Sequence, residues 1–278
     1  MVYKMAQITL SQKKPIKKPH LPIEAEVITP DNFSNKTIEE ISELILWRGN
    51  KQLHIKDLFS IKSNDWSSSV AKDIDIVLTG DLYQFKRIGQ KMTAGSIHIK
   101  SSIGMHLGYL MNGGKIVVEG NTDDFAGANM KKGELIINGN AGHYLGGSVR
   151  GEWRGMNGGK ISVNGSVGNE TGVWMRNGLI EIKEDAQMFL GMHLHRGSII
   201  VHGNVTERAG AEMTGGTIVI HGKLSKLLPS FDFISEIDEI SIDNYDLIKG
   251  QYLEFHGDFA ERKQGKLFLR KDKNKHHL

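Results

Sequence analysis

The sequence contains no cysteine, so it can form no disulfide and offers no thiolate as a nucleophile or as a ligand for zinc or an iron–sulfur cluster. Proline is scarce, with 5 residues, and glycine does not recur at every third position, which excludes a collagen-like chain. No apolar run approaches the roughly 18 residues that span a bilayer, and the start is not typical of a secretory segment. A cytoplasmic protein without a membrane span is expected.

Strong positive charge is also lacking. The formal net charge is +3, whereas nucleic-acid binders concentrate more positive charge than this on one face. We therefore expect no nucleic-acid partner.

Glycine, in contrast, is abundant, with 33 residues, and it is periodic. Successive intervals of 19, 19, 26, 19, 19 and 19 residues separate Gly95, Gly114, Gly133, Gly159, Gly178, Gly197 and Gly216. A second glycine series from Gly89 and a methionine series from Met92, with Leu194 in one place, keep the same intervals. Three series in register indicate an internal repeat.

Each repeat carries two aliphatic residues separated by one other residue, which is typical of a strand with one face on a core. The first column is Ile97, Ile116, Leu135, Ile161, Ile180, Ile199 and Ile218, and the second is Ile99, Val118, Ile137, Val163, Ile182, Val201 and Ile220. Nineteen residues are too few for a strand plus a return helix. The repeat therefore predicts a mainly β fold, a parallel, right-handed β-helix solenoid of about seven coils, with the fourteen aliphatic residues as its structural core and the methionines filling the interior.

Non-repeating segments flank this region, and they predict α/β caps at both ends. We expect an N-terminal cap over 1–73, the glycine-rich β-helix over 74–222, and a C-terminal cap and tail over 223–278. The N-terminal cap should hold a strand at Gln7–Leu10, a basic stretch with prolines (Lys13, Lys14, Lys17, Lys18, Pro19), and a helix from the capping box at Thr37 to near Gly49. In the C-terminal cap we expect loop and helix over 223–249, a two-stranded element at 252–255 and 266–269, and a solvated tail over 271–278.

Two features predict contact with a partner. The interval of 26 residues contains seven extra residues within Gly147–Gly155, and insertions in a solenoid form surface loops, so Arg150, Trp153 and Arg154 are candidate interface residues. The alternative is a solvated loop whose tryptophan lies back on the rod. The outward residues between the paired aliphatics include Val117, Ile136, Ile200 and Val219. Another layer of the same chain or a different protein must cover such an apolar face.

No set of residues predicts catalysis, cofactor binding or a metal site. His193 and His195 lack a nearby carboxylate at a fitting spacing, His202 and His221 occupy equivalent positions and should stack, and Asp123 and Asp124 are expected to be solvated.

The glycine-rich units over 74–222 resemble the β-helix shared by the C subunit of formylmethanofuran dehydrogenase and the C-terminal domain of the glutamate synthase large subunit. The flanks resemble the first family, through Trp47–Leu53 followed by Ile55–Phe59, and through Phe255–Glu261 with Gly265–Leu267.

This resemblance implies a non-catalytic scaffold subunit of an oxidoreductase complex that reduces CO2 and attaches it to methanofuran, the first step of methanogenesis. It implies partner subunits that carry tungsten- or molybdenum-pterin, a binuclear metal site of amidohydrolase type, and ferredoxin-like iron–sulfur clusters, with no cofactor in this chain. Two alternatives remain: the C subunit of the bacterial formyltransferase/hydrolase complex, and a free-standing β-helix binding module.

Overall fold

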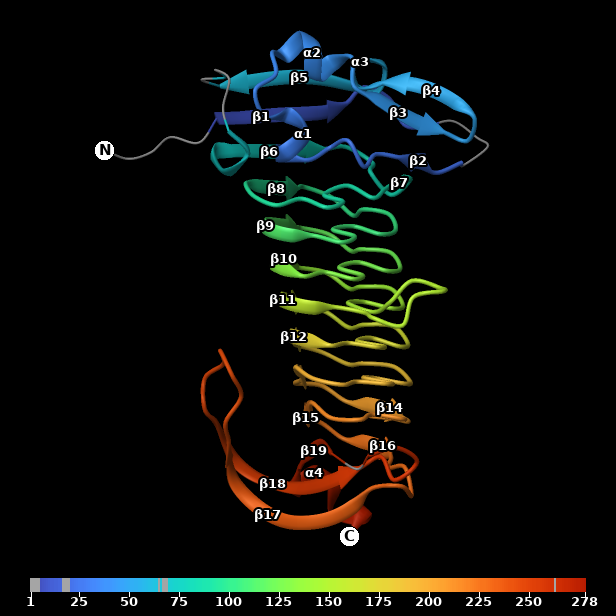
Figure 1. The fold of residues 1–278 in the computed structure, drawn as a ribbon, viewed down its shortest axis with the longest axis vertical. Helices are drawn as coiled ribbons and strands as arrows, with labels where there is room; N and C mark the ends of the chain where they lie inside the picture. The colour runs from blue at the N-terminus through green and yellow to red at the C-terminus, as the bar shows by residue number, and fades with distance from the viewer. Residues whose placement is uncertain (1–5, 17–20, 65, 67–69, 263) are drawn as a thin grey trace, which may run out of the picture.

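The computed structural model describes residues 6–16, 21–64, 66, 70–262 and 264–278. They form an elongated, mainly β molecule in which strands stack one above another along the long axis (Figure 1). Lys17, Lys18 and Pro19 of the basic stretch lie outside the described residues.

One 13-stranded sheet runs the length of the molecule. Its central strands all pair in parallel, and they are β6 (Ile74–Thr79), β8 (Ser96–Ile99), β9 (Asn112–Val118), β10 (Lys132–Ile137), β11 (Asn157–Val163), β12 (Asn177–Ile182), β13 (Ser198–Val201), β15 (Thr217–Ile220) and β19 (Gly265–Arg270). The prediction of a mainly β, parallel architecture is confirmed.

The pairing register follows the repeat. Ile97 lies opposite Ile116, which is followed by Leu135 in the next strand. The longer interval leaves this register intact, because Leu135 still lies opposite Ile161. All fourteen aliphatic residues of the two columns have no exposed surface. Since each residue packs against its equivalents in the neighbouring repeats, the strands complete one another's core.

A second side of each repeat carries a single bridging residue, in the series Leu82, Ile103, Thr122, Ala141, Val167, Ala186 and Val205. The methionines of the repeat, such as Met130 and Met156, are fully buried. Gly127 shows why glycine recurs here. Its φ is +64°, and a Cβ atom on it would lie 2.5 Å from the Cδ1 atom of Ile161.

The residues before β6 add strands at one end of the sheet. β1 (Ala6–Gln12) pairs in parallel with β6 and antiparallel with β5 (Phe59–Asn64). A smaller sheet beside it contains β2 (Ile23–Glu24), β3 (Ile45–Arg48), β4 (Lys51–His54) and β7 (Phe85–Lys86). The expected strand at the start of the chain is therefore present.

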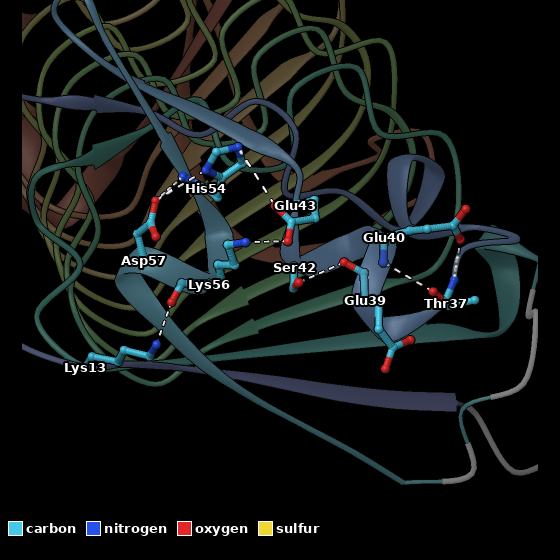
Figure 2. Close-up of polar contacts among 9 residues, drawn as sticks. All are labelled: Lys13, Thr37, Glu39, Glu40, Ser42, Glu43, His54, Lys56 and Asp57. Carbon is cyan, nitrogen blue, oxygen red and sulfur yellow. Dashed lines mark hydrogen bonds and ion pairs between the residues drawn. The ribbon is translucent and has the colours of Figure 1, made fainter.

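The described part of this segment also contains the short α-helices α1 (Pro30–Phe33), α2 (Ile38–Ser42) and α3 (Ile55–Leu58). Figure 2 shows the predicted capping box, in which Glu40 donates its backbone N–H to the Thr37 hydroxyl while the Glu40 carboxylate accepts the Thr37 N–H. An ion pair between Lys56 and Glu43 joins α3 to the end of α2 (Figure 2).

The helix from Thr37 is shorter than predicted. It ends at Ser42, and the expected extension to Gly49 is wrong, because Ile45–Arg48 forms β3 and pairs with β4. Gly49 lies in the turn between these strands with a φ of +61°, so it closes a hairpin and not a helix.

The C-terminal cap also differs from prediction. No helix occurs among residues 223–249, all of which the structure describes. They contain β16 (Leu224–Lys226), which pairs with β14 (Val205–Glu207), and the long strand β17 (Asp232–Ile240). β17 pairs antiparallel with β18 (Ile248–Gly257), and β18 pairs with β19, so the expected two-stranded element has three strands.

The C-terminal tail, residues 271–278, folds into short helical turns and contacts the last repeat. After β19 the chain forms α4 (Lys271–Asn274) and a 3-10 turn over Lys275–His277. Asn274 is fully buried, its Oδ1 accepts the backbone N–H of Leu224, and its Nδ2 donates to the carbonyl of Gly222. The prediction of a solvated tail is wrong for Asn274, which satisfies backbone groups that the end of the repeat leaves unpaired. Most of the other residues of the tail are exposed, as predicted.

Candidate subunit interface

The outward face of the parallel strands has a covered half and an open half. In the C-terminal half, the β17–β18 hairpin curls along the rod (Figure 1). There Ile200 and Val219 have no exposed surface and pack with Tyr252 and Phe268 in a second apolar cluster. The prediction that Ile200 and Val219 contact a partner protein is therefore wrong, since the chain's own hairpin covers them.

A buried carboxylate on the rod accepts a hydrogen bond from the tip of this hairpin. Glu181 is 6% exposed, and it accepts a 2.7 Å hydrogen bond from the Tyr245 hydroxyl near the hairpin tip. Lys183 donates to the same carboxylate, and His202 lies 3.1 Å from it. Burial alone would raise the pKa of Glu181, but the hydrogen bonds from Lys183, Tyr245 and His202 lower it to about 2. The carboxylate is thus ionised and neutralised inside the contact.

A histidine pair lies beside this carboxylate. The rings of His202 and His221 stack with centroids 4.7 Å apart, as their equivalent positions predict. His221 shares a 2.7 Å hydrogen bond with the Tyr252 hydroxyl of β18. Burial, with the charges of His202 and Arg270, lowers the pKa of His221 to about 4. The pair therefore belongs to the packing of the hairpin.

The open half of the face contains Val117 and Ile136, which lie opposite each other on β9 and β10. Both side chains are half-buried. In Figure 1 the β17–β18 hairpin does not reach β9 or β10. A 2.8 Å ion pair between Lys115 and Glu134 borders them. This half presents a small apolar strip between charged side chains, a surface that another protein could cover.

The loop predicted within Gly147–Gly155 lies between β10 and β11 and projects from the rod (Figure 1). Trp153 at its end is 53% exposed. The guanidinium carbons of Arg154 and Arg176 lie 4.3 Å and 4.9 Å from the centre of its ring. The tryptophan does not lie back on the apolar rod. It is held at the surface by two cations.

Backbone contacts fix this loop. Asn129 is 8% exposed, and its Nδ2 donates a 2.5 Å hydrogen bond to the carbonyl of Arg154. Arg176 donates from Nη2 to the carbonyl of Trp153, over 3.2 Å. Burial and the charge of Arg154 lower the pKa of Arg176. Arg150 and Arg154 are exposed at the same loop. Of the predicted residues, Trp153 and Arg154 are thus in contact and Arg150 lies on the same loop, while Arg176 joins the contact from the next repeat.

A column of stacked side chains was not identified from the sequence. Seven residues at equivalent turn positions have a φ between 58° and 67°: Arg87, His106, Phe125, Tyr144, Glu170, Phe189 and Arg208. The ring of Phe125 stacks on those of His106 and Tyr144, with centroids 4.9 Å and 4.6 Å apart. Each of the seven lies two residues before a glycine of the second series, and that fixed offset was the available signal.

The other candidate residues are occupied in structural contacts. His193 stacks on Trp174 at 3.8 Å, and His195 bonds to the hydroxyl of Thr214 at 2.9 Å. Asp123 and Asp124 are both half-buried, and Asp124 accepts the backbone N–H of His143, so the expected solvation of this pair is only partial. In the described part of the chain, no three His, Asp or Glu side chains gather closely enough to hold a metal ion.

A groove with a volume of about 750 Å³ lies between the repeat and the hairpin tip. Its walls include several repeat glycines, the cations Lys160 and Arg196, and Asp243 and Asn244 of the tip. These groups offer polar contacts without a nucleophile paired to a base.

A membrane-spanning helix is absent from the described residues.

The chain is similar to known proteins over most of its length. Residues 68–271 match the family model described as the GXGXG motif. The chain is 48% identical, over 92% of its length and 94% of the relative, to the C subunit of tungsten-containing formylmethanofuran dehydrogenase 2 from Methanococcus maripaludis. It is 42% identical to the C subunit of molybdenum-containing formylmethanofuran dehydrogenase 1 from Methanosarcina barkeri, over 37% of this chain and 33% of the relative.

Among solved structures, a chain of the formyltransferase/hydrolase complex from Methylorubrum extorquens, determined with methylofuran, has a similar fold. The TM-score is 0.78 at 24% identity, and the match covers 94% of this chain and 99% of that chain. This similarity extends through both caps as well as the repeat.

Proposed function

The chain belongs to the GXGXG family and, within it, to the C subunits of formylmethanofuran dehydrogenase, and from this membership we propose that it is a non-catalytic structural subunit of a formylmethanofuran dehydrogenase. That complex reduces CO2 and attaches it to methanofuran as a formyl group, the first step of methanogenesis. The observation that carries the proposal is the similarity to a relative of that name over nearly the full length of both chains.

We assign the reduction of CO2 and the transfer of the formyl group to other chains of the complex. We propose partner subunits that hold tungsten- or molybdenum-pterin, iron–sulfur clusters and a binuclear metal site. The sequence supports this division because it contains no cysteine and so offers no thiolate to a cluster or to a pterin-bound metal. A cytoplasmic location is part of the same proposal.

The scaffold itself is proposed to be a right-handed solenoid of about seven coils over 74–222, between caps over 1–73 and 223–278. Parallel pairing of the repeats supports this division. Two of its surfaces are proposed to contact partners: the strip of Val117 and Ile136, and the loop with Arg150, Trp153 and Arg154. Both are open in the chain alone, and both lie on the ordered repeat, which holds them in a fixed relation.

The bacterial formyltransferase/hydrolase complex is the alternative assembly. The fold is compatible with it, but the identity to the first dehydrogenase relative, 48%, is twice the 24% to the chain of that complex. A free-standing binding module is the other alternative, and it would leave the apolar strip without a cover.

Purification of the tagged full-length chain from its native cells tests the proposal. We expect co-purification, in fixed ratio, with chains that contain tungsten or molybdenum and iron, identified by mass spectrometry and metal analysis. A lone monomer on gel filtration would favour the binding module, and co-purification of a formyltransferase without the pterin metal would favour the bacterial type. An Ile136→Asp variant that stays folded but recovers fewer partners would assign the strip to the interface.

A further inference from the structure

The projecting loop gathers positive charge that the chain does not neutralise. Arg154 and Arg176 form no ion pair with a carboxylate within the described residues, and the Nε of Arg176 is shielded from solvent without an acceptor. In contrast, the outward face of the strands pairs most of its charges, as in Lys115 with Glu134. Burial, and then repulsion by the neighbouring guanidinium group of Arg154, lowers the pKa of Arg176.

This loop is held in place before any partner arrives. Asn129 binds the carbonyl of Arg154 and also accepts the N–H of Val149 at 3.4 Å, so one buried side chain fixes both ends of the loop. Arg176 is fixed in turn by its bond to the carbonyl of Trp153. Because these side chains are already ordered, binding costs little further conformational entropy.

We propose that the Arg154–Trp153–Arg176 cluster is the docking site for an acidic segment of a partner polypeptide in the proposed complex. Guanidinium groups bind carboxylates in paired hydrogen bonds, and an exposed indole ring adds apolar contact beside them. Arg150, exposed on the same loop, extends the charge. The inference rests on the proposed function, because it requires a partner chain.

The arrangement fits a peptide better than a nucleic acid. The guanidinium groups of Arg154 and Arg176 lie at one loop and the adjacent strand end, and exposed Glu152 belongs to the same loop. A phosphate backbone would meet that carboxylate, whereas binding along nucleic acid usually needs a longer basic stripe. A short run of aspartate or glutamate can place its side chains on the arginines and leave Glu152 in solvent.

The first test uses the purified full-length chain and a fluorescent oligo-glutamate peptide, with binding followed by anisotropy at low salt. We expect R154Q/R176Q to weaken binding by roughly tenfold or more, since each lost guanidinium–carboxylate bond is charge-assisted. The matched control K51Q/K62Q removes two exposed cations from the N-terminal cap and should change binding less than about twofold. R154K/R176K should recover part of the affinity, which separates charge from folding.

Equal weakening in both double variants would overturn the inference, because it would mean that the peptide responds to net charge alone. Tighter binding of a fluorescent single-stranded oligonucleotide than of the peptide would also overturn it.

The second test uses the assembled native complex, with a photo-crosslinking amino acid in place of Glu152. The expected crosslinked peptide comes from another chain of the complex and is rich in aspartate or glutamate. A crosslinked peptide of neutral or positive charge would overturn the inference while the proposed function stands. Failure of the wild-type chain to assemble would instead remove the proposed function, so the two outcomes are distinct.

Discussion

The two halves of the outward strand face have the same backbone and a similar alternation of side chains, yet only one is covered. In the C-terminal half, Ile200 and Val219 lie under β17 and β18, and Glu181 fastens the hairpin tip. In the N-terminal half, Val117 and Ile136 stay half-buried beside surface ion pairs. This contrast shows that equivalent apolar outward positions can be covered by the chain's own hairpin in one half and stay partly open in the other.

The largest expected effect concerns the core behind both halves. Ile137 belongs to the core side of a strand in the open half, and Val201 to the core side of a strand in the covered half. Neither residue has exposed surface, and each is replaced by aspartate. Each variant should lose roughly 4–5 kcal/mol or more of stability, because a carboxylate would be buried without a partner. Urea unfolding followed by circular dichroism measures the loss. If one of the two variants kept wild-type stability, the halves would not share one continuous core.

A direct comparison of the halves uses truncation on the outward face. Ile200→Ala should cost about 2–4 kcal/mol because it opens a cavity under the hairpin. Ile136→Ala, its counterpart in the open half, should cost less than about 1 kcal/mol in the free chain. Thermal unfolding gives both values. Equal losses would show that the hairpin adds no burial energy to Ile200.

Acid should destabilise the covered half selectively. His221 has a folded pKa of about 4, below its ordinary 6.5, so between these values the unfolded chain binds a proton that the folded chain does not. Stability therefore falls as the pH falls from 6.5 to 4, by at most about 3 kcal/mol. Glu181, with a pKa of about 2, extends the loss below pH 4.5.

Hydrogen exchange at about pH 7 and about pH 4.5 checks this prediction. Amides of β17 and β18 should lose protection at the lower pH while those of β9 and β10 keep theirs. His221→Gln should reduce the change in hairpin protection between the higher and the lower of these two pH values, because the titrating imidazole is gone. An equal loss of protection in both halves would contradict the assignment of the pH effect to the hairpin contact.

The smallest expected effect is at the hairpin tip. Tyr245→Phe removes the 2.7 Å hydrogen bond to the Glu181 carboxylate and should cost about 1–2 kcal/mol. Tyr109→Phe, in the N-terminal part of the repeat, is the matched control and should cost less than about 0.5 kcal/mol. Limited proteolysis near Asn244 should become faster in the first variant only.

The parallel architecture could be predicted because the spacing of the repeat determines which residues of neighbouring strands lie opposite each other. Ile116 and Leu135 are neighbours in the sheet because they are nineteen positions apart, and no long-range guess is needed. The same spacing put His202 on His221 and marked the loop that contains Trp153. Periodicity along one chain was sufficient for these features.

The cover of the strand face could not be predicted in the same way. β17 has two register irregularities, between Phe233 and Ser235 and between Ile237 and Glu239. Each irregularity shifts the strand's two-residue alternation, so its isoleucines at 234, 237 and 240 are spaced as in a helix. Arg176 was likewise missed, since its role depends on a loop that reaches it from the previous repeat.

The ends of the sheet also determine how long this molecule can become. Within the described ranges, the outermost strands β5 and β17 both run antiparallel to their neighbours. A further copy arriving at either end would meet the wrong strand direction for the parallel repeat to continue, and β17 adds irregular hydrogen-bond spacing. Stacked, self-similar repeats of this kind could otherwise template fibre growth. The two reversals in strand direction therefore limit the growth of the sheet at both of its ends.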